Sequence, residues 1–376
     1  MSKKVSAPIS SQLVEELRQI GAQEFKLTKT KKDDARAVNL GKEIVFLDYL
    51  GATLKGAFGR EIPKSLVAKK PPKGKPLKRV LNLVLSDTHF GSNPDPRETR
   101  NKYGPLEASR RLAKVIRQAI TYKTEHRDYT HLNMHILGDM FQGQLHDPRD
   151  GEPLAEQMGE TIHLLAQAVK VASQEFPQVN VAFQPGNHGR NTARHKDRAT
   201  FQKWDSNETV VYYAIKTIAK MAKWDNVRFA LPYTPYYLID TLGHGIFGTH
   251  GDTVLHPGNP HKTINVGALT NQVNKIVAAE ARIGGIQPKL FIMGHVHIGT
   301  DVNLPSDITV ITNGCLLPPD PYALSIGAFD SACGQQLFET TEEHAFGDHR
   351  FIRVNEKTDK DSSLDGLILP YTGLDS

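Results

Sequence analysis

Five short segments of the sequence place aspartate, asparagine or histidine among small residues, each directly after an apolar run. The apolar runs predict buried β-strands, and open α/β sheets bind ligands at the carboxyl ends of their strands. We therefore expect the five segments to converge on one edge. Their carboxylate, amide and imidazole groups suffice for two divalent ions, with Asp139 central enough to bridge them. The segments are Asp87-Thr88-His89, Gly138-Asp139, Gly186-Asn187-His188, His250-Gly251-Asp252 and Gly294-His295-Val296-His297.

The five segments carry this inference only as a set. A lone Asp-x-His after a strand is usually a cap with a surface histidine, and a Gly-Asp pair is usually a turn. Gly-Asn-His and Gly-His-x-His are more specific, but neither alone establishes a metal site. All five in this order, each at a strand end, favour a metal centre over five unrelated turns.

The elements that must position these segments alternate between short apolar runs and longer amphipathic stretches. This alternation predicts a layered α/β domain, and we expect its later strands to pair antiparallel. The expected strands lie at 80–86, 133–137, 179–183, 227–231, 236–240, 245–249, 289–293 and 308–312, and the expected helices at 106–125, 153–175, 207–223 and 263–282.

As a set, the segments resemble the five motifs of the calcineurin-like metallophosphoesterase superfamily over residues 80–300. The resemblance implies a metallophosphoesterase-type β-sandwich flanked by helices (αββα) and a metal-dependent hydrolase of phosphate esters. It also implies two divalent ions, with Mn²⁺ the ion that it suggests, and gives His188 a catalytic role at the leaving group. The implied ligands are Asp87, His89, Asp139 and His297 for one ion, and Asp139, Asn187, His250 and His295 for the other.

The chemistry of phosphate diesters agrees with these implied roles. A diester resists hydrolysis because its negative charge repels nucleophiles and its leaving alkoxide is a strong base. Two cations about 3.5–4 Å apart neutralise the phosphate oxygens and lower the pKa of the attacking water. A histidine that titrates near neutral pH can protonate the departing oxygen, as the resemblance implies for His188.

One departure from the family pattern follows the third segment. Many members of the superfamily continue Gly-Asn-His with Asp or Glu, whereas Gly189 and Arg190 stand here. Another group must therefore orient His188. Arg190 could bind a substrate phosphate through its guanidinium, or it could be an ordinary surface arginine.

Charge is distributed unevenly along the chain. Residues 1–79 hold 18 Lys and Arg against 8 Asp and Glu, a net of +10, whereas the whole chain is +5 (46 minus 41). Three prolines, a glycine and several lysines make 69–79 an extended basic linker. We expect a basic N-terminal module at 1–68, a catalytic domain at 80–345 and a C-terminal extension at 346–376. The basic arm suits a polyanionic partner, although a solvated lysine-rich tail is the simpler alternative.

The substrate is indicated by two further stretches. Residues 140–143 read Met-Phe-Gln-Gly, without the arginine that protein phosphatases of this superfamily carry there, which argues against a phosphoprotein substrate. Residues 190–198 are basic, and aromatic residues follow, a combination that suits a nucleic-acid strand. The alternative is a solvated helix start with both tyrosines in the core. The candidate substrate-binding residues are Arg190, Arg194 and Lys196, and the aromatic residues are Trp204, Tyr212 and Tyr213.

These features favour a nuclease resembling the SbcD-type and phage-encoded DNA repair phosphoesterases, and the stretch 312–323 resembles the corresponding region of phage-type members. We expect DNA rather than RNA as partner, and a homodimer or protein partner is open. A phosphodiesterase or phosphomonoesterase for small nucleotides and a non-catalytic scaffold also stay open. Retention of every expected ligand argues against the scaffold.

The composition of the chain indicates where in the cell the protein is expected. The two cysteines, Cys315 and Cys333, are too few for a disulfide framework or a cysteine-ligated zinc site. No apolar run approaches the roughly 20 residues of a membrane helix, and the first residues lack the apolar core of a secretory signal. We expect no membrane partner and a cytoplasmic location, in a bacterium or a phage-infected host cell.

Overall fold

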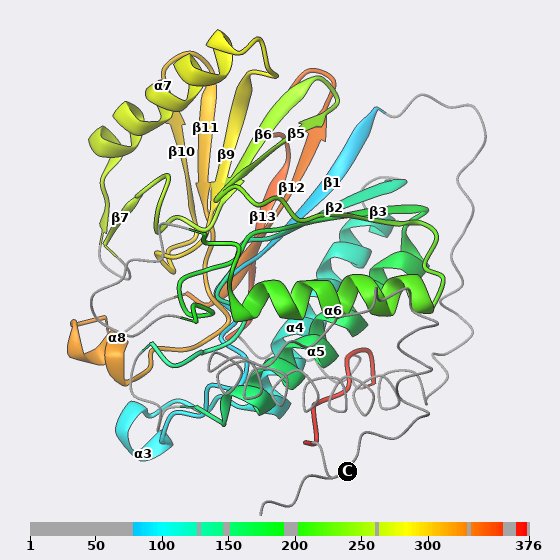
Figure 1. The fold of residues 1–376 in the computed structure, drawn as a ribbon, viewed down its shortest axis with the longest axis vertical. Coiled ribbons are helices and arrows are strands. Elements are labelled where there is room, and N and C mark those ends of the chain that lie inside the picture. Colours follow the sequence, from blue (N-terminus) through cyan, green and yellow to red (C-terminus); the bar gives the residue numbers. More distant parts are fainter. Residues whose placement is uncertain are drawn as a thin grey trace, which may run out of the picture. The chain divides into compact units, whose positions relative to one another are not determined.

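The structure is a computed structural model, and it describes residues 78–125, 129–145, 151–191, 202–259, 263–328, 332–355 and 366–373. The expected N-terminal module and almost all of the basic linker lie outside these residues. The described part contains two β-sheets with helices on their outer faces (Figure 1).

The first sheet has six strands in the order β13-β12-β1-β2-β3-β4. The four strands β1 to β4 run parallel, whereas β12 is antiparallel to β1 and β13 is antiparallel to β12. Its parallel part places the ends of β1, β2 and β3 at one edge. The strands are β1 (Arg79–Leu85), β2 (His131–Ile136), β3 (Gln178–Phe183), β4 (Val227–Ala230), β12 (Gly334–Thr341) and β13 (His349–Arg353).

The second sheet has five strands in the order β10-β11-β9-β6-β5, and a two-stranded ribbon of β7 and β8 stands apart from it. The bounds are β5 (Tyr237–Thr241), β6 (His244–Thr249), β7 (Gly258–Asn259), β8 (Thr263–Ile264), β9 (Pro288–Met293), β10 (Thr300–Leu304) and β11 (Ile308–Thr312).

The expected antiparallel pairing of the later strands is confirmed for some pairs and wrong for others. β10 is antiparallel to β11, and β12 is antiparallel to both β1 and β13. β5 and β6 are antiparallel, but β6, β9 and β11 run parallel, and β4 joins the first sheet parallel to β3. The reason is the helix between β6 and β9, because a helical crossover returns the chain to the same edge and so produces parallel strands.

The longer helices cover the two outer faces, and the two sheets pack against each other (Figure 1). Val84 and Phe338 of the first sheet share a buried cluster with Ile246 and Ile292 of the second. Each such side chain contributes about 1.5–3 kcal/mol by its removal from water. This arrangement confirms the expected β-sandwich flanked by helices. The helices are α3 (Pro96–Thr99), α4 (Pro105–Glu125), α5 (Leu154–Glu175), α6 (Asn207–Met221), α7 (Val266–Arg282) and α8 (Pro321–Ser325).

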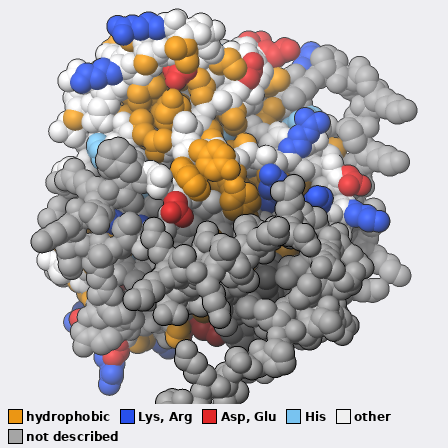
Figure 2. Space-filling view, viewed as in Figure 1, with side chains coloured by type: hydrophobic (Ala, Val, Ile, Leu, Met, Phe, Trp, Pro, Cys, Tyr) orange, Lys and Arg blue, Asp and Glu red, His pale blue; other side chains and the backbone are white. Residues whose placement is uncertain are grey.

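The surface carries exposed hydrophobic side chains as well as charged ones. In the space-filling view they gather over the second sheet, with Lys and Arg around them rather than among them (Figure 2). Exposed apolar atoms are common on soluble proteins, so this grouping alone indicates no partner. Among the described residues, no helix combines the length and apolar character needed to span a membrane.

Candidate metal centre

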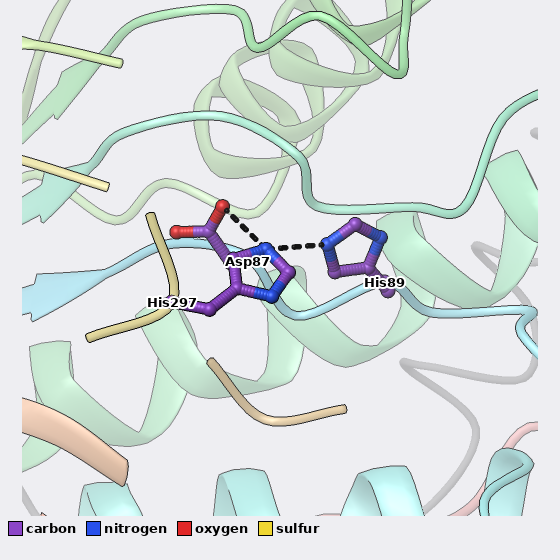
Figure 3. Close-up of side chains that lie close together, drawn as sticks. All are labelled: Asp87, His89 and His297. Atoms are coloured by element: carbon purple, nitrogen blue, oxygen red, sulfur yellow. Dashed lines mark hydrogen bonds and ion pairs between the residues drawn. The ribbon is translucent and has the colours of Figure 1, made fainter. Parts of the chain in front are cut away.

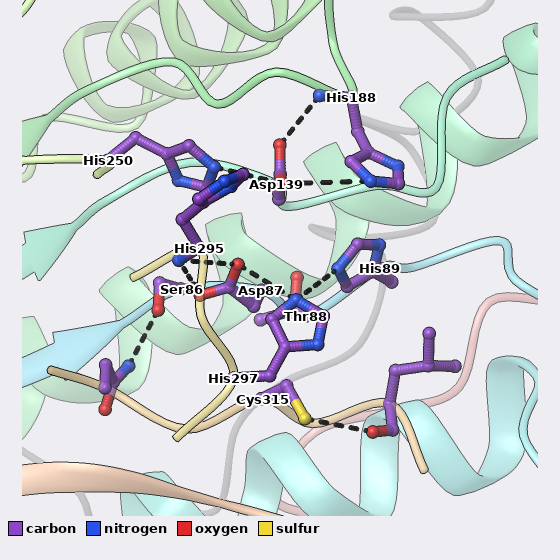
Figure 4. Close-up of polar contacts among 12 residues, drawn as sticks. Ser86, Asp87, Thr88, His89, Asp139, His188, His250, His295, His297 and Cys315 are labelled. Atoms are coloured by element: carbon purple, nitrogen blue, oxygen red, sulfur yellow. Dashed lines mark hydrogen bonds and ion pairs between the residues drawn. The ribbon is translucent and has the colours of Figure 1, made fainter. Parts of the chain in front are cut away.

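The five segments meet at the carboxyl ends of β1, β2, β3, β6 and β9, as the sequence predicts (Figure 4). Backbone hydrogen bonds join neighbouring segments directly. Asp87 N donates to Gly138 O at 3.0 Å, and Gly294 N donates to His250 O at 2.9 Å. The candidate ligands therefore occupy one edge that both sheets share.

The first group consists of Asp87, His89 and His297, whose ligand atoms all lie within 4.8 Å of one another (Figure 3). His297 Nε2 lies 3.2 Å from Asp87 Oδ1 and 3.3 Å from His89 Nε2. Burial, together with the nearby histidines, holds the pKa of His89 well below its ordinary value. His89 is therefore neutral at pH 7 and offers a lone pair, which suits a metal ligand.

The second group consists of Asp139, His250 and His295, again within 4.8 Å of one another. His250 Nε2 lies 3.0 Å from Asp139 Oδ2 and 3.0 Å from Asn187 Oδ1. His250 Nδ1 donates to Leu137 O at 2.7 Å, so the other ring nitrogen faces the two oxygens. A hydrogen bond from the other ring nitrogen to a backbone carbonyl is the usual way in which a metal-binding histidine is oriented.

The pKa of His250 shows how strongly this pocket attracts positive charge. Burial acts to lower it, but the charge of Asp139 and the hydrogen bond to it raise the pKa of His250 to about 9. A proton on Nε2 thus lies where oxygen ligands converge. The residues fit a divalent cation, which would replace that proton.

Asp139 lies between the two groups. Its Oδ1 accepts a hydrogen bond from the His188 N–H at 2.8 Å, and Oδ2 faces His250. It also forms a cluster with His89 and His188 within 4.8 Å. This central place agrees with a bridging ligand, a role that stays a prediction.

His188 is oriented by Gln142. His188 Nδ1 donates to the Gln142 carbonyl at 2.6 Å, and its Nε2 lies 4.0 Å from Asp139 Oδ2. The Gln142 side chain accepts from His89 Nδ1 at 2.9 Å, so one residue fixes two imidazoles. Sequence reasoning missed Gln142, because only the folded loop brings its two ends to different histidines.

The backbone at the site is unusual. Five candidate ligands have φ between 49° and 70°, a left-handed conformation that non-glycine residues rarely adopt. Such residues cost about 1–3 kcal/mol each and cluster at functional sites. The five are Asp87, His89, Asp139, His295 and His297.

Two glycines allow the carboxylates to approach the loops. A Cβ atom at Gly186 would overlap Asp139 Oδ1, and one at Gly294 would overlap Asp87 Oδ2. The glycines of these motifs are therefore required by the packing of backbone against ligand carboxylates.

A second pair that sequence reasoning missed lies beside His250 and His295. Lys203 Nζ forms an ion pair with Asp252 Oδ1, and Lys203 is only 4% exposed. Although burial acts to raise it, Lys203 and the two histidines lower the pKa of Asp252. The position of Asp252 after His250 was a signal, but nothing in the sequence indicated Lys203 as its partner.

The candidate substrate-binding residues are only partly described. Arg190 Nε donates to Asn187 O at 2.7 Å, which places its guanidinium beside a candidate ligand loop. Arg194 and Lys196 lie outside the described residues. The role of all three in substrate binding stays a prediction.

The aromatic residues behave differently from one another. Tyr212 is fully buried, stacks on Phe183 at 4.3 Å and donates to Gln184 O, so the core alternative holds for it and its expected contact with a substrate is wrong. Tyr213 is 44% exposed and Trp204 is 37% exposed. Adjacent helix positions point in different directions, and only Tyr212 faces the sheet.

Comparisons with known proteins give no family match. No protein-family model matches the chain, and no curated protein matches it. Solved structures with a similar arrangement include a hypothetical protein from Pyrococcus horikoshii OT3 (TM-score 0.38, 14% identity, 76% of this chain and 91% of that one). Others are a dimetal phosphatase from Danio rerio (0.37, 10%, 74% and 100%) and the calcineurin-like phosphoesterase YfkN from Bacillus subtilis (0.31, 10%, 77% and 96%). Likenesses with TM-scores below 0.5 do not indicate a function for this chain. The functional argument rests on the residues of the site.

Proposed function

We propose that this chain is a dinuclear-metal-dependent phosphodiesterase that hydrolyses nucleic acid, DNA rather than RNA. It would belong to the calcineurin-like metallophosphoesterases, near the SbcD-type and phage-encoded nucleases. The observation that carries the proposal is the convergence of two His/Asp groups on one sheet edge with Asp139 between them. Mn²⁺ is the ion that the sequence resemblance suggests.

In this proposal, seven side chains would bind the two ions and one histidine would transfer a proton. Asp87, His89 and His297 would hold one ion, and Asn187, His250 and His295 the other, with Asp139 shared. The bound ions would supply Lewis-acid polarisation of the phosphate. His188, held through Nδ1 by the Gln142 carbonyl, turns its Nε2 toward the centre and would pass a proton to the departing oxygen.

Exposed aromatic rings beside the centre support a nucleic-acid substrate. Trp204 and Tyr233 meet edge to face with their ring centroids 5.0 Å apart, and the side chain of Tyr233 raises the pKa of Tyr213. They come from three segments, and Tyr233 is 65% exposed. Lys203, next to Trp204, is tied to Asp252 beside the metal ligands. Exposed rings of this kind can stack unpaired bases, which favours a single-stranded segment at the site.

Replacing Trp204 and Tyr233 together by alanine is expected to weaken binding of single-stranded DNA by at least about tenfold, since stacking contributes roughly 1–3 kcal/mol per base. Hydrolysis of bis-p-nitrophenyl phosphate should stay near the wild-type rate, because that diester needs no base stacking. Fluorescence anisotropy and a colorimetric assay measure the two. Leu106→Ala, which removes another exposed apolar side chain from α4, is the control. Equal losses for both substrates would contradict the prediction.

Removing residues 1–77 tests whether the basic arm binds nucleic acid. Residues 1–77 carry a net charge of +8 (16 Lys and Arg minus 8 Asp and Glu), more than the +5 of the whole chain. Each neutralised phosphate of duplex DNA adds about 0.9 to the slope of log affinity against log salt. Truncation should weaken binding at low salt and flatten that slope, while small-diester hydrolysis remains. A well-folded truncation with unchanged affinity and slope would contradict a tether. An insoluble or wholly inactive one would show that the segment belongs to the folded body.

The proposed function is tested by assaying the purified protein with Mn²⁺ on single-stranded DNA, duplex DNA, RNA and bis-p-nitrophenyl phosphate. We expect cleavage of DNA that EDTA abolishes and added Mn²⁺ restores. Activity on bis-p-nitrophenyl phosphate without any nucleic acid cleavage would favour a small-nucleotide phosphodiesterase. Two bound ions with no activity on any of the four substrates would contradict the proposal that the protein is an enzyme.

A further inference from the structure

Glu208 is a buried carboxylate at the start of α6 that sequence reasoning did not single out. It is fully buried, and Ser206 caps the helix just before it. Its Oε1 accepts the N–H of Met140 at 2.5 Å, and its Oε2 accepts the N–H of Gly186 at 2.5 Å. Both carboxylate oxygens thus accept hydrogen bonds from backbone amides. Burial of an acidic side chain costs free energy, and these hydrogen bonds offset that cost.

The two amides belong to two different loops. One loop carries the ligand that both sites are expected to share, and the other carries a ligand that is expected only in the second site. Met140 directly follows Asp139, and Gly186 directly precedes Asn187. The loops touch, because a Cβ atom at Gly138 would overlap Gly186 N. One bidentate carboxylate therefore connects the loop of the expected bridging ligand with the loop of the expected amide ligand.

Glu208 also fills the space beside the position where this chain departs from the family pattern. A Cβ atom at Gly189 would lie 2.6 Å from Glu208 Cγ. Gly189 O in turn accepts hydrogen bonds from Ser206 Oγ and from Asn207 N, both at 2.9 Å. The start of α6 is thereby fixed against the Gly-Asn-His loop, and the Cβ and Cγ atoms of Glu208 occupy the space that a side chain at 189 would need.

The chemistry of the two partners explains why an acid stands here. Both partners are N–H donors, so the residue between them must present two acceptors. Glutamine has one carbonyl oxygen, and its amide group would face a donor with a donor. An aliphatic side chain would leave both amides without an acceptor.

We propose that Glu208 is a positioning residue that sets the separation of Asp139 and Asn187 and thereby forms the second metal site. The inference rests on the proposed dinuclear centre. It assigns Glu208 no contact with metal or substrate. The first site shares Asp139, but its other three expected ligands, Asp87, His89 and His297, come from other loops, so it should depend on Glu208 less than the second site does.

Glu208→Gln tests the proposal against Glu339→Gln. Glu339 is also buried, and its Oε2 accepts hydrogen bonds from Tyr129 and Arg79, but it lies beside the beginning of β1, at the opposite end of the sheet. Mn²⁺ binding to full-length protein is followed by calorimetry and metal analysis. We expect two ions in wild type and in Glu339→Gln, and one tight ion in Glu208→Gln with the second at least tenfold weaker. Two ions with wild-type affinities in Glu208→Gln, or equal weakening at both sites, would overturn the proposal.

Hydrogen exchange of the wild-type protein gives a second test that needs no variant. The amides of Met140 and Gly186 should exchange slowly in metal-free protein, at least tenfold slower than an unprotected amide, because their acceptor is a side chain that stays in place. Exchange at the unprotected rate would overturn the proposal even if Glu208→Gln fails to fold. Absence of Mn²⁺ binding by wild type would instead contradict the proposed function, while the exchange rates still report on Glu208.

Discussion

Asp139→Asn is expected to abolish phosphodiester hydrolysis, by at least about three orders of magnitude, and to reduce the metal content of the protein. Asparagine keeps the acceptor for the His188 N–H but removes the charge, and that charge is the main force that raises the pKa of His250. Two cations brought close together repel each other, so loss of the anion between them affects both sites. Metal analysis and the bis-p-nitrophenyl phosphate assay measure the two effects.

The control for this substitution is Asp95→Asn. Asp95 caps the short helix α3, is partly exposed to solvent, and its carboxylate contacts Arg97 rather than a candidate ligand. It undergoes the same chemical change and should keep both metal content and activity. If Asp139→Asn retained two ions per chain and activity within a few-fold of wild type, Asp139 would not bridge.

The strands that position the centre were predictable because their sequences are mostly apolar up to the point where each strand ends. β1 reads Arg-Val-Leu-Asn-Leu-Val-Leu, and β9 reads Pro-Lys-Leu-Phe-Ile-Met. Strands buried on both faces give such continuous runs, and the polar residue that ends each run then marks the sheet edge. The positions of Asp87 and His295 follow directly from this pattern.

β12 was not predicted, because its sequence is not a continuous apolar run. It lies between β1 and β13 and is almost entirely buried, yet its sequence contains two glutamines and a glutamate. Gln335 accepts hydrogen bonds from Ser86 N and from Asn313, at the ends of β1 and β11. Polar side chains that are satisfied by distant loops look like surface residues when only the sequence is available.

The residues that support the ligands were also beyond sequence reasoning. Gln142 binds His188 through its backbone carbonyl and His89 through its side chain, and Glu208 binds backbone amides of two other loops. Such contacts between distant segments leave no pattern of residue types in the sequence. The left-handed backbone at the candidate ligands could not be predicted either. A glycine in the sequence can indicate a positive φ, whereas an aspartate or a histidine does not. The gathering of the candidate ligands at one sheet edge was therefore predictable, whereas the contacts that hold each of them in place were not.

His188→Gln is expected to lower the turnover of a DNA substrate by about 10²–10⁴-fold while metal content and DNA binding stay unchanged. Glutamine cannot act as an acid near neutral pH, but it is small enough to keep the loop that Asp139 fixes through the backbone of residue 188. His163→Gln, a buried histidine of α5 that contacts Leu369 O, is the matched control and should retain full turnover.

The leaving group separates proton donation from metal binding. p-Nitrophenolate departs without a proton, whereas the alkoxide of a nucleotide is a strong base that needs one. If His188 is the proton donor, the defect of His188→Gln should be much smaller with bis-p-nitrophenyl phosphate than with DNA. Equal defects with both substrates, accompanied by a lost ion, would make His188 a metal ligand. Its cluster with His89 and Asp139, all within 4.8 Å, makes that the specific alternative to distinguish.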